Sequence, residues 1–251
     1  MSEFRLKIGL DLPINGIPQQ TIYEGITPKS VAVVGSDYNG LKPRMLVVEG
    51  DEVVRGTPLF SHKEAPNVMF VSPCKGRVRG VMRGARRVLQ SVIIDVDDID
   101  DKGVNFGAIG SDGFRRDEVK KILFDSGLWT SFLTRPYSKM PLEEDVPSAI
   151  FVTAMETEPL APDASVVVSQ EQEAFNLGVS SIATLTDGKV YICKASSGTI
   201  GDVTGVANAE SHKFDGPHPS GLAGTHMHFL NPPSVNNVVW SIGYQLSLIH
   251  I

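Results

Sequence analysis

The sequence is poor in cysteine and contains no long apolar run. Its two cysteines, Cys74 and Cys193, lie far apart and match no metal-binding or redox spacing, so we expect both to be small buried hydrophobic residues. No stretch approaches the roughly 20 apolar residues of a membrane-spanning helix. The first seven residues contain neither an apolar core nor a cleavage site, so we expect no secretory signal. A reducing cytoplasm is the simplest location.

Excess positive charge and a glycine-rich phosphate loop are also lacking. The chain has 23 Lys and Arg against 29 Asp and Glu, a formal net charge of −6, which argues against a nucleic-acid surface. No G-x-G-x-x-G sequence occurs, which argues against an ordinary dinucleotide loop. The 41% hydrophobic and 21% charged residues are typical of a globular protein. With 251 residues, the chain can form one large or two ordinary domains.

The chain up to about residue 97 consists of short runs of β-branched and apolar residues that are separated by turn residues. No helical period is present there. The pattern predicts a small all-β domain. The runs cover residues 31–34, 45–48, 52–54, 68–71 and 88–94.

An acidic stretch, residues 95–101, follows this region with five aspartates in seven positions. It is a linker at a domain boundary or, equally well, an acidic edge strand that runs into a loop. Either interpretation places a change of domain near residues 100–112. We therefore predict an all-β domain with an N-terminal extension over residues 1–110 and an α/β domain over residues 111–251.

After the acidic stretch the hydrophobic period becomes helical. Val119, Ile122 and Leu123 predict a helix over residues 115–126, which Gly127 should end. The alternation of predicted strands and helices beyond it is that of a parallel sheet, and hence of a Rossmann-like fold. We expect strands at 148–154, 190–193 and 238–242, and a helix over 165–185, in one piece or in two around Gly178.

Two segments in the first region resemble the biotinyl/lipoyl-type barrel-sandwich fold. They are residues 48–59 and 71–78, in which Gly50, Gly56 and Gly76 supply the turns. The resemblance implies a barrel-sandwich domain. Carrier domains hold a modified lysine near the position of Lys63, but its neighbours here, His62 and Glu64, are not those of a carrier. We expect no covalent cofactor and a barrel used for packing or docking.

The candidate binding residues lie in two irregular segments, 154–163 and 216–230. Turn residues are dense in both, and irregular segments on a rigid scaffold are where ligands usually bind. His226 and His228 would face the same way on a strand, but a structural role is favoured over a metal site because no Cys or carboxylate sits alongside. We predict no metal ligand and no catalytic residue. The candidates for cofactor binding are Glu156, Glu158, His218, Gly221 and His226.

Residues 156–163 resemble the acidic loop of two electron-transfer proteins, the flavoprotein of respiratory complex I and the RnfC protein of the Rnf electron-transport complex. Those relatives place a glycine-rich phosphate loop after their first helix. The matching segment here, 126–141, has a single glycine and the bulky residues Trp129, Phe132 and Tyr137. The resemblance therefore implies that the fold is kept and the phosphate cradle is lost.

Longer collinear segments resemble the NqrA family, which belongs to the bacterial sodium-translocating NADH:quinone oxidoreductases (Na+-NQR), over residues 5 to about 245. In that family two further domains follow, and the sequence departs from the family pattern at residues 246–251. The segments are Lys7-Ile-Gly-Leu-Asp-Leu-Pro-Ile14, Arg87-Val-Leu-Gln-Ser-Val92, Gly127-Leu-Trp129, Arg135-Pro-Tyr-Ser-Lys139, Gly216-Pro-His-Pro219 and Gly224-Thr-His-Met-His-Phe-Leu230.

This resemblance implies a peripheral component on the cytoplasmic face of the bacterial inner membrane. It implies a part in the assembly of the Na+-NQR complex and in ubiquinone reduction coupled to Na+ export, with NAD(H) and flavins held by the partner proteins of the complex. We expect the chain by itself to be inactive. Two other functions stay open: a flavin- or NADH-binding module like RnfC, and a docking scaffold without a ligand.

Overall fold

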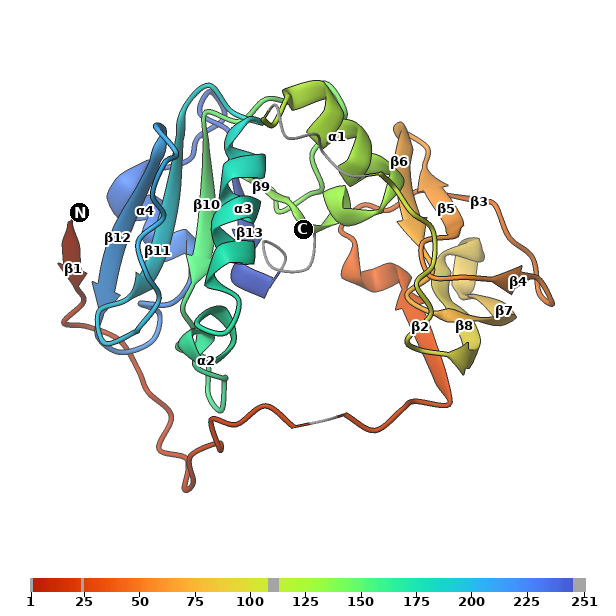
Figure 1. Cartoon of the computed structure of the whole chain (residues 1–251), viewed down its shortest axis with the longest axis horizontal. Helices are drawn as coiled ribbons and strands as arrows, with labels where there is room; N and C mark the ends of the chain where they lie inside the picture. The colour runs from red at the N-terminus through yellow and green to blue at the C-terminus, as the bar shows by residue number, and fades with distance from the viewer. Residues whose placement is uncertain (1, 24, 108–112, 246–251) are drawn as a thin grey trace. The chain divides into compact units, whose positions relative to one another are not determined.

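The computed structural model describes residues 2–23, 25–107 and 113–245 (Figure 1). These residues form two compact units. Of the described residues, the barrel unit contains 25–107, 113–130 and 138–145, and the α/β unit contains 2–23, 131–137 and 146–245. The sequence departure at residues 246–251 lies outside the described residues.

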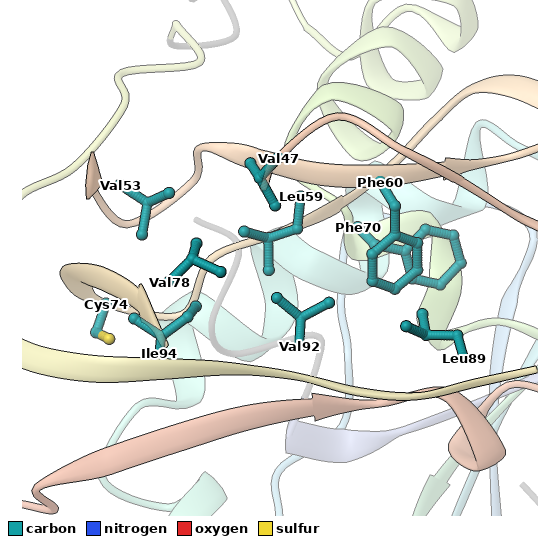
Figure 2. Packing of buried hydrophobic residues seen from close by; sticks show 10 residues of the cluster. All are labelled: Val47, Val53, Leu59, Phe60, Phe70, Cys74, Val78, Leu89, Val92 and Ile94. Carbon is teal, nitrogen blue, oxygen red and sulfur yellow. The ribbon is translucent and has the colours of Figure 1, made fainter. Parts of the chain in front are cut away.

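The barrel unit consists of two antiparallel sheets around one aliphatic and aromatic core. Figure 2 shows this core, in which Leu59, Phe60 and Val92 are fully buried. Cys74 lies in it as expected, and burial raises the pKa of its thiol. The all-β prediction is confirmed. One sheet has the order β2 (Ser30–Val34), β8 (Leu89–Asp98), β7 (Lys75–Arg83), β4 (Glu52–Val53), and the other has the order β3 (Pro43–Met45), β5 (Pro58–His62), β6 (Ala65–Val71).

Two details of this unit bear on the sequence-based prediction. The strand expected over 45–48 is instead β3, which ends at Met45, and the chain continues as a loop with Val47 buried. Residues 95–98 are the end of β8 and not a linker; they pair with β7, only Asp95 among them also pairs with β2, and the strand then runs into a loop, as the second interpretation expected. Their alternation with Val92, Ile94 and Val96 keeps the apolar side chains on one face.

Among the described residues, one α-helix packs on the barrel unit. Helix α1 (Arg116–Asp125) contacts β6 and ends before Gly127, whose φ is +79°, as the sequence predicted. A short 3-10 helix, η3 (Leu128–Ser131), follows. The predicted division between residues 110 and 111 falls in segment 108–112, outside the described residues, and stays a prediction.

The α/β unit is built on a six-stranded sheet that is parallel except for its last strand. Helices α3 and α4 cover opposite faces of this sheet (Figure 1). On the α4 face, Met227 packs against Phe151, Cys193 and Phe214. The βαβ prediction is confirmed. The sheet order is β1 (Glu3–Arg5), β12 (Ala209–Asp215), β11 (Lys189–Ala195), β10 (Ala149–Ala154), β13 (Val239–Gly243), β9 (Leu133–Arg135), and the helices are α2 (Ala164–Val168), α3 (Gln172–Ala183) and α4 (Ala223–Leu230).

Three features of the α/β unit were not anticipated. The N-terminal segment, grouped with the barrel domain in the sequence-based division, contributes β1, which pairs with β12. The helical stretch 165–185 is interrupted between α2 and α3, at residues 169–171, whereas Gly178 lies inside α3 and is buried. His226 and His228 lie on α4 and not on a strand.

Candidate functional site

The sheet of the α/β unit reverses its strand order at β10. From β10 the chain passes through α2 and α3 to β11 on one side, and α4 later carries it to β13 on the other side. Ligands of open α/β sheets bind at such a reversal, outside the carboxyl ends of the strands. The segments that follow β10 and β12 are residues 155–163 and 216–222, so the topology brings both predicted segments to this edge.

Thr157, His218 and Gly221 form a hydrogen-bonded group at this edge. The Gly221 N–H donates to the Thr157 hydroxyl at 2.9 Å, and His218 Nδ1 lies 3.1 Å from both the hydroxyl and the carbonyl oxygen of Thr157. Because a carbonyl only accepts, this contact favours the tautomer in which Nδ1 carries the proton. Nε2 is then the ring nitrogen left for a ligand.

Gly221 makes this arrangement possible through close backbone approach. A Cβ atom at this position would lie 2.7 Å from the Thr157 backbone nitrogen and 2.8 Å from its hydroxyl oxygen. Any side chain would therefore push the loop after β12 away from the loop after β10. Gly221 acts by its lack of a side chain.

The N-terminal segment after β1 lies against His218. The Leu10 N–H donates to the His218 carbonyl oxygen, and the His218 N–H donates to Asp11 Oδ1, both at 2.9 Å. Gly9 permits this contact, because a Cβ there would lie 2.2 Å from the same carbonyl oxygen. Backbone and carboxylate thus fix the orientation of His218.

An apolar pocket of about 410 Å³ results from these contacts. Its walls are mainly aliphatic, and its polar groups are Asp11, Thr157 and His218. Sequence reasoning missed this pocket. Thr157 stands between two predicted residues, and the N-terminal segment was noted only as part of a family resemblance. The aliphatic lining consists of Leu10, Leu12, Ile14, Ile17 and Leu160, with Gly16, Pro18 and Pro159.

A second cavity, the carboxylate pocket, lies at the strand reversal itself. It has a volume of about 380 Å³ and is lined by Glu156 and Glu158 after β10 and by Gly243, Tyr244 and Gln245 at the end of β13. Burial, and then the charge of Glu158, raise the pKa of Glu156. Two carboxylates at this position can accept hydrogen bonds from ligand hydroxyl groups.

His226 lies in the core and lines neither pocket. It is 0% exposed, and its Nε2 donates to the Ser220 carbonyl oxygen at 2.9 Å. Burial lowers its pKa to about 4. On a helix, residues two apart point about 200° from one another, so the prediction that His226 and His228 share a face is wrong, and His228 is exposed. His226 ties α4 to the loop that holds Gly221.

The bulky residues expected in place of a phosphate loop have separate roles. Trp129 is buried in the barrel unit and donates to the Pro141 carbonyl oxygen at 2.9 Å. Phe132 is buried in the α/β unit, with its ring centroid 5.4 Å from that of Trp240. Tyr137 is 69% exposed. Trp129 and Phe132 therefore serve as core residues.

The remaining candidate residue is Lys63. It is exposed in the turn between β5 and β6, the hairpin position expected from the carrier comparison.

No group of three His, Cys, Asp or Glu side chains in residues 2–23, 25–107 and 113–245 lies close enough to hold a metal ion. None of the helices described there has the length and apolarity needed to cross a membrane.

Comparison with known proteins gives two domain matches. The family model described as the NqrA N-terminal barrel-sandwich hybrid domain matches residues 4–97, and that of the NqrA second alpha/beta domain matches residues 114–251. Together with the sheets described above, these matches confirm the predicted fold: a barrel-sandwich domain followed by an α/β domain.

Curated relatives agree with these matches. The chain is 50% identical over 241 residues to the A subunit of the Na(+)-translocating NADH-quinone reductase of Vibrio alginolyticus. It is 46% identical over 244 residues to the protein of the same name from Photorhabdus laumondii. Each alignment covers 96% of this chain and 54% of the relative. The chain thus spans about half the length of the curated relatives that it matches.

Proposed function

Because the chain belongs to the NqrA family, we propose that it acts as part of the A subunit of a Na+-pumping NADH:ubiquinone oxidoreductase. In this role it is a peripheral component on the cytoplasmic face of the bacterial inner membrane. It assembles with the other proteins of the complex, which hold NAD(H) and the flavins. The chain itself contributes to the binding and reduction of ubiquinone.

The apolar pocket is the observation that supports the quinone role. Ubiquinone has a flat ring with two carbonyl oxygens and an isoprenoid tail, and a mainly aliphatic cavity with few polar groups suits such a molecule. Leu12, Ile14 and Leu160 would contact the ring and the first part of the tail. Thr157 and His218 provide the polar end.

Reduction of a quinone to a quinol takes up two electrons and two protons. Partner proteins of the complex would deliver the electrons, and this chain's residues would bind the ring and handle a proton. A histidine that carries a proton on both ring nitrogens can donate the one on Nε2 to a quinone oxygen and then take another from solvent. His218 is positioned for this by its hydrogen bonds to Thr157 and Asp11.

The carboxylate pocket favours a second candidate function, a flavin- or nucleotide-binding module. Glu156 and Glu158 could accept hydrogen bonds from ribose hydroxyl groups at the strand reversal. Against this candidate stands the lack of a glycine-rich loop that would let backbone N–H groups approach a phosphate.

Saturation-transfer NMR on the 251-residue chain tests both functions. The ligands are a water-soluble short-chain ubiquinone, NADH and FMN, each measured separately. We expect signal from the quinone, and we expect the double variant Leu12→Asn, Ile14→Asn to lose it. Ile8→Asn is the matched control, because Ile8 belongs to the same exposed segment but does not line the pocket.

The alternative outcomes separate the candidates. Signal from NADH or FMN that Glu156→Gln removes would replace the quinone function by the nucleotide-binding one. No signal from any of the three ligands would contradict a ligand-binding role for this chain and leave a docking scaffold.

A further inference from the structure

The barrel unit contains a basic pocket that plays no part in the proposed quinone function. It has a volume of about 640 Å³ and lies between the loop after β2 and the hairpin turn between β7 and β8. The described residues that line it include five cationic side chains and no carboxylate. Such a concentration is notable in a chain whose net charge is −6. The cationic residues are Lys42, Lys63, Arg83, Arg86 and Arg87.

Most of these cations lack an anionic partner within the described part of the chain. Lys42 pairs with Glu64 at 2.5 Å, and Arg83 Nη1 donates to the Arg87 carbonyl oxygen at 3.1 Å. No ion pair or side-chain hydrogen bond is found there for Lys63 or for the guanidinium groups of Arg86 and Arg87. Like charges held together without counter-charges repel one another, and an anion in the pocket would relieve that repulsion.

Two other arginines of the same unit show the ordinary arrangement. Arg77 pairs with Glu52 at 2.8 Å, and Arg79 pairs with Asp95. Both lie on β7, as does Arg83, but neither lines the basic pocket. Arg77 and Arg79 therefore have carboxylate partners, whereas the three arginines that line the basic pocket have none within the described residues.

The backbone of the turn supports the same conclusion. Arg86 has a φ of +55° and Arg87 a φ of +61°, a left-handed conformation that glycine adopts freely and other residues adopt at a cost. Two consecutive arginines in this conformation are strained, and strain that persists points to a use for the side chains. In this turn both side chains line the basic pocket.

We propose that the basic pocket binds the phosphoryl group of a small organic phosphate. Guanidinium groups bind phosphate oxygens through two parallel hydrogen bonds, and they bind planar and tetrahedral oxyanions better than ammonium groups do. Arg83, Arg86 and Arg87 would hold the phosphoryl group. Tyr38 and Leu41 line the same pocket and would contact the organic part of the ligand.

The shape of the pocket favours a small ligand over an acidic protein surface. Its volume falls in the range of pockets that enclose small molecules. Its lining combines charged groups with the side chains of Tyr38, Leu41 and Val88, and a purely electrostatic docking patch has no need of such a lining. The phosphoryl group can belong to a soluble metabolite or to a lipid headgroup, and the test below distinguishes these sources.

Isothermal titration of the 251-residue chain with inorganic pyrophosphate tests the proposal. We expect one binding site per chain. The double variant Arg86→Gln, Arg87→Gln should weaken binding by at least about tenfold. The double variant Arg77→Gln, Arg79→Gln removes the same charge outside the pocket and should bind like the unmodified chain. Circular dichroism establishes that each variant is folded.

Two further measurements complete the test. The variant Arg86→Lys, Arg87→Lys keeps the charge but loses the planar guanidinium. Its affinity for pyrophosphate should therefore lie between that of the unmodified chain and that of Arg86→Gln, Arg87→Gln. Sedimentation with phosphatidylcholine vesicles that contain phosphatidylglycerol identifies the source: pelleting that pyrophosphate reverses indicates a lipid headgroup, and no pelleting indicates a soluble phosphate. Absence of pyrophosphate binding, or equal weakening by the Arg77/Arg79 variant, would overturn the proposal.

Discussion

The two units of this chain carry cavities of opposite chemistry. The basic pocket of the barrel unit is lined by five cations, whereas the apolar pocket of the α/β unit is lined mainly by aliphatic side chains. The net charge of −6 over the whole chain does not reveal that one unit has a basic pocket and the other an apolar one. Average charge and hydropathy therefore say little about ligands when each unit has a binding chemistry of its own.

The two pockets also differ in how they are built. The basic pocket is lined by residues of segments 35–43 and 83–89 and by Lys63, all within the barrel unit. The apolar pocket depends on contacts such as that of His218 with Asp11, which are 207 residues apart. The first can therefore tolerate substitutions elsewhere in the chain, and the second depends on the whole α/β sheet.

Acid should destabilise the α/β unit selectively. Burial lowers the pKa of two histidines in this unit: that of His226 falls from 6.5 to about 4, and that of His212 also decreases. The unfolded chain then binds protons more readily than the folded one. The contribution of these histidines to the free energy of unfolding is therefore fully present above pH 6.5 and is lost as the pH falls towards 4. We expect a loss of about 3 kcal/mol from His226.

The two tryptophans allow each unit to be followed separately, since Trp129 lies in the barrel unit and Trp240 in the α/β unit. With Trp129→Phe as the background, urea unfolding followed by Trp240 fluorescence measures the slope with pH. His226→Gln should flatten the slope, and His228→Gln, at an exposed position, should leave it unchanged. The variant Trp240→Phe reports on the barrel unit through Trp129. If its unfolding free energy changed with pH by the same slope, this prediction would be wrong.

Gly221→Ala should cost the α/β unit about 2 kcal/mol, because the new Cβ would overlap the backbone of residue 157. It should also weaken binding of short-chain ubiquinone by separating the two loops. Gly224→Ala is the control, since nothing lies within 4 Å of a Cβ there, and it should change the unfolding free energy by at most about 1 kcal/mol. Equal stabilities of the two variants would refute the close-approach argument.

Replacing the two strained arginines by glycine should increase the stability of the barrel unit. Arg86→Gly with Arg87→Gly should stabilise it by about 1 kcal/mol, because glycine relieves the positive φ at some entropic cost. The same variant should lose pyrophosphate binding. Thermal unfolding followed by Trp129 measures the first effect and titration the second. A destabilised variant would show that the turn is held by its arginine side chains.

The smallest expected effect concerns the carboxylate pocket. Glu158→Gln should lower the pKa of Glu156 only partly towards its ordinary value, because burial is the larger cause of the upward shift. Carbon-13 NMR titration of the Glu156 carboxyl group measures this change, with Glu171→Gln as a control in the same unit. An unchanged pKa in Glu158→Gln would show that burial acts alone.

Local sequence signals predicted much of the fold. The apolar period of residues 119–123 and the glycine at 127 correctly delimited α1. The start of α2 had a local signal, since Asp163 caps it by accepting a hydrogen bond from the Ser165 N–H at 2.8 Å, whereas no side-chain cap marks the start of α3 after the break.

Signals that depend on distant contacts were harder to interpret. His226 and His228 were expected on a strand, but they belong to α4, in which His226 and Met227 are buried. The loops with Glu156, His218 and Gly221 were selected because turn residues are dense there. The structure brings these loops together, and their role in binding stays a prediction. The N-terminal segment could not be placed beside them, since neither its composition nor its period indicates that β1 joins β12.

The most direct test of the separation of the two chemistries is a two-ligand NMR titration of the isotopically labelled 251-residue chain. Short-chain ubiquinone should shift the amide signals of Thr157 and Gly221, and pyrophosphate should shift those of residues 83–89, with no amide in common. Ubiquinone shifts at residues 35–43 of the basic pocket, or pyrophosphate shifts at Thr157, would contradict the account.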